Sequence, residues 1–73
     1  PHNPNAAVRA VQTIILAVEQ LGAFPAAGAP WGVDPQYREL IVPFGARAYI
    51  VRYRILEDRV IVVRVWHGLE DRK

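Results

Sequence analysis

The spacing of apolar side chains changes once along the chain, and this change limits the fold more than any other feature. Residues 4–22 carry apolar side chains three and four positions apart, which is the period of an amphipathic helix. The stripe consists of Val8, Val11, Ile15, Val18 and Leu21, widened by Ile14. From residue 38 onward the period is two, which is typical of strands. A single helix followed by strands predicts an α+β domain.

Both ends of the predicted helix carry residues that favour a helix terminus. Asn3 is suited to the N-cap because its side-chain oxygen can accept a free amide proton of the first turn. Gly22 is suited to the left-handed backbone that commonly ends a helix. Residues 23–37 are rich in Gly, Pro and Ala, which predicts a connecting loop. We expect Phe24 and Trp31 to anchor this loop to the core by their large area.

Three antiparallel strands are predicted after the loop, at residues 38–44, 47–56 and 59–67. Gly45-Ala46 and Glu57-Asp58 supply the two turns between them. A chain of 73 residues is the length of one small domain, so residues 1–73 are expected to form a single unit. The predicted architecture is one amphipathic helix packed on a three-stranded antiparallel sheet.

One helix can cover only one face of such a sheet, so the other face is expected to stay open. The residues expected beneath the helix are Tyr49, Val51, Tyr53, Ile61, Val63 and Val65. The apolar residues expected on the far side are Ile50, Val60, Val62 and Trp66, beside Arg52, Arg54 and Arg64. A half-apolar, arginine-bearing face with free edge strands is typical of a surface that receives another chain.

Several kinds of chemistry are excluded by composition. The chain has no cysteine and no serine, and its one threonine, Thr13, lies in the middle of the predicted helix, so no nucleophile is predicted. The two histidines, His2 and His67, lie near opposite ends of the sequence, and no carboxylates cluster around them. The glycines of residues 22–32 neither follow a strand nor open a helix. We therefore predict no catalytic residue, no metal site and no cofactor.

Arginine dominates the positive charge of the chain. The net charge is only +2, but eight of the nine basic residues are arginine, which favours planar, bidentate contacts to carboxylate or phosphate. The candidate binding cluster contains Arg52, Arg54, Arg64, Trp66 and His67, with Tyr49 and Tyr53 nearby. It is suited to a phosphate backbone, a stacked base or an acidic peptide. Two alternatives are a cross-strand ion pair of Arg64 and acid–base catalysis by His67.

Several segments, in this order, resemble a ParE-type toxin of the RelE/ParE superfamily across essentially the whole chain. They are Asn3-Pro4, Ala6-Ala7, Phe24-Pro25, Arg38-Glu39-Leu40, Tyr49-Ile50-Val51-Arg52-Tyr53-Arg54, Arg64-Val65-Trp66-His67-Gly68 and Asp71-Arg72. Members of the family also carry a strand and a first helix before the Asn-Pro turn, and this sequence lacks both. The resemblance therefore covers the second helix and the three-stranded sheet.

The resemblance implies a bacterial toxin of a type II toxin-antitoxin system, neutralised by a ParD-like antitoxin. The ParE branch poisons DNA gyrase, whereas the RelE branch cleaves messenger RNA on the ribosome. RelE-type nucleases resemble one another in having basic residues at two positions that Ile50 and Glu70 occupy in this sequence. They also resemble one another in a basic or tyrosine-bearing C-terminal tail, and the given sequence ends before any tail tyrosine. Because Glu70 would repel the charge that develops on the phosphate, the sequence favours a gyrase inhibitor that binds and is not an enzyme.

Six residues form the predicted site for the antitoxin or the target: Arg38, Arg52, Arg54, Arg64, Trp66 and His67. Of these, Arg38, Arg54 and Arg64 match arginines that recur in the family. Two alternatives remain open, a RelE-like ribonuclease that uses His67 and Arg54, and an inactive remnant that only binds antitoxin. We expect a cytoplasmic protein with no membrane contact and no sequence-specific nucleic-acid binding. The expected location and the lack of membrane contact follow because no signal peptide is seen and no unbroken apolar run reaches about 20 residues.

Overall fold

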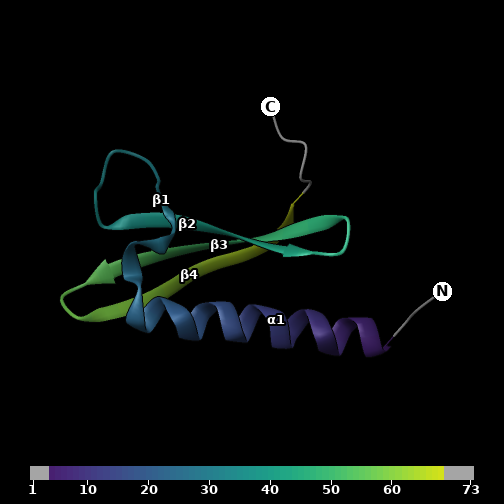
Figure 1. The fold of residues 1–73 in the computed structure, drawn as a ribbon. Helices are drawn as coiled ribbons and strands as arrows, with labels where there is room; N and C mark the ends of the chain where they lie inside the picture. The colour runs from purple at the N-terminus through teal and green to yellow at the C-terminus, as the bar shows by residue number, and fades with distance from the viewer. Residues whose placement is uncertain (1–3, 69–73) are drawn as a thin grey trace.

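A computed structural model describes residues 4–68, in which one helix lies along one face of a four-stranded antiparallel sheet (Figure 1). The elements are α1 (Pro4–Ala23), a 3-10 turn η1 (Pro25–Ala27), β1 (Ala29–Pro30), β2 (Tyr37–Phe44), β3 (Arg47–Leu56) and β4 (Arg59–Gly68). The strands lie in sequence order in the sheet. This confirms the predicted α+β class. The added strand β1 is two residues long, too short for a periodic signal, and pairs with β2. Asn3 and Glu70 lie outside the described residues.

The sheet has an inner face, which α1 covers, and an outer face on the opposite side. Val42 of β2 lines a pocket with Leu21 of α1 and is 5% exposed, whereas its neighbour Ile41 is 53% exposed, so the side that Val42 shares with Leu40 is the inner one. Leu40 pairs with Val51 of β3, which pairs with Val65 of β4. Residues paired across antiparallel strands project on the same side, so this row is inner and the rows next to it are outer.

A bulge in β4 changes which of its side chains face outward. The pairing shifts between Arg52 and Tyr53: Tyr53 lies opposite Val62, whereas Arg52 lies opposite Arg64, and Val63 is the extra residue. The expectation of unbroken alternation is therefore wrong in this strand. Three residues of β4 lie on the face opposite to the one predicted: Val60, Ile61 and Val62.

Helix α1 packs on the sheet by a stripe that overlaps the predicted one only in part, at Leu21 and at the half-buried Ile14 and Val18. Ala10 and Leu21 are its buried residues. Val8, Val11 and Ile15 of the predicted stripe are 54%, 55% and 50% exposed. The prediction is wrong at these three positions because the helix is apolar on more than one side, and the period alone does not choose which side meets the sheet. By length and composition alone, α1 would also be sufficient to cross a membrane.

The loop between α1 and β2 is fastened to the sheet by Tyr53, which is fully buried. Its hydroxyl accepts a hydrogen bond from the Gly28 N–H at 2.9 Å and donates one to the Pro25 carbonyl at 2.5 Å. A Cβ at residue 28 would lie 2.7 Å from the Glu39 carbonyl oxygen and 2.8 Å from the Tyr53 hydroxyl, so glycine is required. Phe24 is 68% exposed, and its expected anchoring role is wrong.

Candidate functional site

Three charged side chains form a row across the outer face of the sheet. Glu39 of β2 is the cross-strand partner of Arg52 of β3, which is in turn the partner of Arg64 of β4. Arg52 donates to Glu39 Oε2 from Nη2 at 2.7 Å and from Nε at 2.9 Å. Both of these side chains are only 19% exposed, so water screens the pair weakly. Within residues 4–68, Arg52 therefore has a carboxylate partner and Arg64 has none.

Two tryptophans hold the arginines of this row in place. The guanidinium carbon of Arg52 lies 3.6 Å from the ring centroid of Trp31 and 5.0 Å from that of Trp66. The guanidinium carbon of Arg64 lies 4.8 Å from the same Trp66 ring. Such contacts stabilise the cation by the negative charge on the ring face. We call Trp31, Glu39, Arg52, Arg64 and Trp66 the arginine–tryptophan cluster.

Arg54 extends the same face toward the loop. Its Nε donates to the Gln36 side-chain oxygen at 3.1 Å, and its guanidinium carbon lies 5.7 Å from the Tyr37 ring centroid. Tyr37 meets Trp31 edge to face, with centroids 6.1 Å apart. Three arginines of the outer face, Arg52, Arg54 and Arg64, therefore lie among three aromatic rings.

The other two predicted site residues, Arg38 and His67, lie on the inner face. Arg38 is paired with Tyr53, and its Nη1 donates to the carbonyls of Gly28 at 2.6 Å and Ala26 at 3.4 Å, so it helps to hold the loop. The Arg38 Nε is buried without a hydrogen-bond partner in the described part of the chain. His67 lies opposite Tyr49, with ring centroids 5.0 Å apart. The structure thus brings four of the six predicted residues together and separates two.

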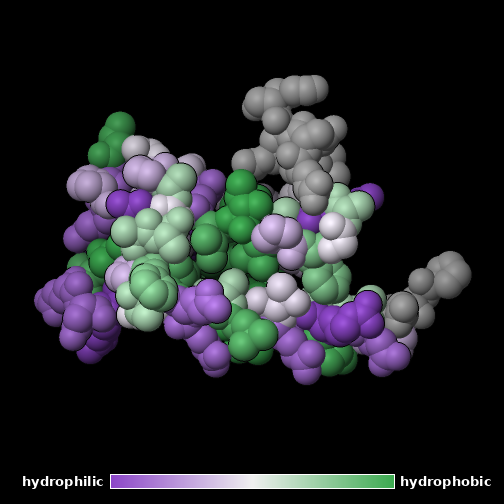
Figure 2. All heavy atoms as spheres, in the orientation of Figure 1, coloured by the Kyte–Doolittle hydropathy of each residue, from purple (hydrophilic) through white to green (hydrophobic). Residues whose placement is uncertain are grey.

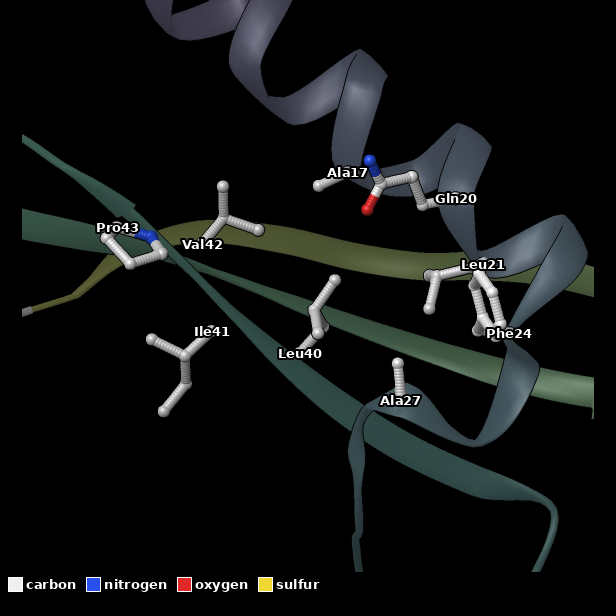
Figure 3. Close-up of a pocket in the computed structure, with 9 residues that line it drawn as sticks. All are labelled: Ala17, Gln20, Leu21, Phe24, Ala27, Leu40, Ile41, Val42 and Pro43. Carbon is white, nitrogen blue, oxygen red and sulfur yellow. The ribbon is translucent and has the colours of Figure 1, made fainter.

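A pocket of about 240 Å³ lies on the inner side, between the C-terminal half of α1 and β2 (Figure 3). Its lining residues are Ala17, Gln20, Leu21, Phe24, Ala27, Leu40, Ile41, Val42 and Pro43. In the space-filling view, apolar side chains gather in the middle of the molecule above the helix, with hydrophilic ones around them (Figure 2). The pocket contains no ionisable side chain, so it can hold an apolar group but cannot supply acid–base chemistry.

Sequence reasoning missed two members of the cluster, Glu39 and Trp31. A signal for Glu39 was present, because a two-residue turn at residues 45–46 fixes the register of β2 against β3 and sets Glu39 opposite Arg52. Trp31 has no such signal, since its position depends on how the loop is held by Tyr53.

The outer face carries side chains that are suited to binding. Its arginines and rings can contact anions and planar groups. In the described range 4–68, no group of three His, Asp or Glu side chains is close enough to hold a metal ion. The one histidine of that range, His67, lies on the other side of the sheet from the three arginines.

Comparison with known proteins gives a consistent result. A family model, the ParE toxin of the type II toxin-antitoxin system parDE, matches residues 2–72. The chain is 43% identical over 70 residues to the toxin RelE1 of Caulobacter vibrioides, covering 96% of this chain and 73% of the relative. It is 39% identical over 69 residues to the toxin RelE3 of the same organism, covering 94% of this chain and 73% of the relative. Comparison with solved structures gave no significant match.

Proposed function

The chain belongs to the family of ParE toxins of type II toxin-antitoxin systems, and on this premise we propose that it inhibits DNA gyrase by binding and does not cleave RNA. The two relatives described above are named RelE toxins, so both branches of the superfamily have to be weighed on the residues themselves.

The observation that carries the proposal is the separation of His67 from Arg54. A ribonuclease built from these two side chains needs both of them at one phosphodiester, within hydrogen-bond reach. His67 lies opposite Tyr49 on the inner face, whereas Arg54 lies opposite Tyr37 on the outer face. The sheet stands between them, which supports a toxin that acts by occupying its target.

The outer face supplies the contacts for the proposed partners. Arg64 and Arg54 present guanidiniums that no carboxylate of residues 4–68 neutralises, and Trp66 lies between Arg64 and Arg52. We place the contacts to a ParD-like antitoxin or to gyrase on these residues. Arg52 holds Glu39 and Trp66 in position beside these contacts. Arg38 and His67 would contact a partner only where it also reaches the inner face. In this proposal the protein works in the cytoplasm, where gyrase and the antitoxin are found.

A gyrase supercoiling assay with the natural gene product tests this function. We expect supercoiling to fall in a dose-dependent way and to be restored by equimolar antitoxin. Arg64→Gln is expected to weaken inhibition, and Arg9→Gln on the exposed side of α1 is the matched control. Full supercoiling activity at saturating toxin would refute the proposal.

Primer extension on translated messages separates the alternatives. Cuts at codon boundaries in cells that express the toxin would identify a RelE-like ribonuclease. Tight binding of antitoxin without growth arrest, gyrase inhibition or message cleavage would identify an inactive remnant.

A further inference from the structure

We propose that Arg64, lying on the ring of Trp66 beside Arg52, is the receptor for one carboxylate of a protein partner. The partner residue is an aspartate or glutamate, which supplies a second acid to the row of Glu39, Arg52 and Arg64. This inference rests on the proposed function only in that it takes the partner to be a protein, such as the antitoxin.

The charges of the row are incomplete within the described chain. Arg52 and Arg64 are direct cross-strand partners, and like charges in that position destabilise a sheet. Glu39 neutralises one of them through the contacts to Arg52. The row therefore keeps one positive charge, located on the exposed Arg64 guanidinium. A single carboxylate on Arg64 would leave every charge of the row with an opposite neighbour.

The bulge in β4 is what creates this arrangement. If the pairing set by the turn at residues 57–58 continued without a shift, Arg64 would lie opposite Val51, on the inner face. The extra residue at the bulge turns Arg64 outward, next to Arg52. Bulges commonly occur where a side chain is redirected toward a binding site. The sheet thus places a second cation beside a first at an electrostatic cost that a bound anion would remove.

The surroundings of Arg64 favour a carboxylate over a nucleic-acid backbone. A backbone brings one negative charge with every nucleotide, and a phosphate next to the one on Arg64 would meet the carboxylate of Glu39 on the same row. Each of the two neighbouring outer rows exposes an apolar side chain, Ile41 (53% exposed) in one and Ile61 (40% exposed), beside Arg54, in the other. An acidic residue between apolar ones matches this pattern of charge and hydrophobicity.

The two tryptophans make the subsite directly observable. The chain has only two tryptophans, and both belong to the cluster, so indole N–H signals in two-dimensional NMR report on it alone. The probes are two N-acetylated, C-amidated pentapeptides, Leu-Val-Glu-Val-Leu and Leu-Val-Gln-Val-Leu. We expect the glutamate peptide to shift the Trp66 signal and to bind about tenfold more tightly, as one added charge-assisted hydrogen bond would give.

Two arginine variants decide whether the preference comes from Arg64. Arg64→Gln is expected to abolish the preference for the glutamate peptide. Arg59→Gln, an exposed arginine at the hairpin end of the same strand, should keep it. Equal affinities of the two peptides for the unaltered chain would overturn the proposal, as would a preference that survives in Arg64→Gln.

The role of Glu39 is tested with an oligouridylate probe. The unaltered chain is expected to bind it more weakly than the glutamate peptide, and Glu39→Gln should raise its affinity several-fold because the row then carries two positive charges. Tighter binding of oligouridylate than of the peptide would replace the carboxylate with phosphate as the ligand. None of these measurements uses gyrase or toxicity, so a failure here and a failure of the proposed function are distinguishable.

Discussion

Replacing Tyr53 by phenylalanine tests whether one hydroxyl holds the loop that carries Trp31. The change removes two hydrogen bonds and leaves the Gly28 N–H and the Pro25 carbonyl without their partner. An unsatisfied buried polar group costs about 1–3 kcal/mol, and Gly28 is buried, so we expect a loss of about 2–4 kcal/mol in the free energy of unfolding. That is a large fraction of the stability of a domain of this size.

Urea unfolding followed by far-UV circular dichroism measures this loss. With an m-value of about 1 kcal/mol per molar urea, the midpoint should fall by roughly 2 M or more. In the folded variant, the Trp31 indole signal should move because Trp31 leaves Arg52, while the Trp66 signal changes less. Tyr49→Phe is the matched control, since Tyr49 is only half-buried and its ring contacts with Phe44 and His67 do not require the hydroxyl. A loss for Tyr53→Phe no greater than that of the control would refute the reasoning.

Four further changes test the packing of the helix, the loop and the hairpin by the same unfolding assay. Leu21→Ala should cost about 3 kcal/mol because Leu21 is 1% exposed, whereas Ile15→Ala, 50% exposed, should cost less than about 1 kcal/mol; similar losses would contradict the observed helix face. Glu57→Gly should stabilise by up to about 1 kcal/mol because Glu57 has a φ of 57°, and a net loss would argue against strain in this turn. Gly28→Ala should destabilise by more than about 1 kcal/mol through the close approach of its Cβ to the Glu39 carbonyl, and wild-type stability would show that the loop adapts freely.

The sequence predicted the helix and the meander because each has a period that only one kind of element explains. The register of β2 against β3 could also be predicted from the sequence, because a two-residue turn at residues 45–46 allows only one pairing of the two strands. The bulge in β4 could not be predicted, because the residues before it, Val60 to Val63, are all β-branched and no polar side chain marks a face. The buried side of α1 could not be predicted either, because the helix is apolar on more than one side and the helical period alone does not choose between them.

The arginines of this chain cannot be ranked by sequence, because their value to a partner depends on which contacts they already have. The Arg38 guanidinium is bonded to loop carbonyls and that of Arg52 to Glu39, so recruiting either by a partner would first break contacts within the chain. Arg64 lies on a ring that limits its motion without using its N–H groups. Binding then loses little side-chain entropy, which otherwise costs about 0.5–1.5 kcal/mol for each flexible side chain. Arg54 is also without a carboxylate, but its Nε is already bonded to Gln36, so Arg64 is the position on this face where a partner's carboxylate contributes most to affinity.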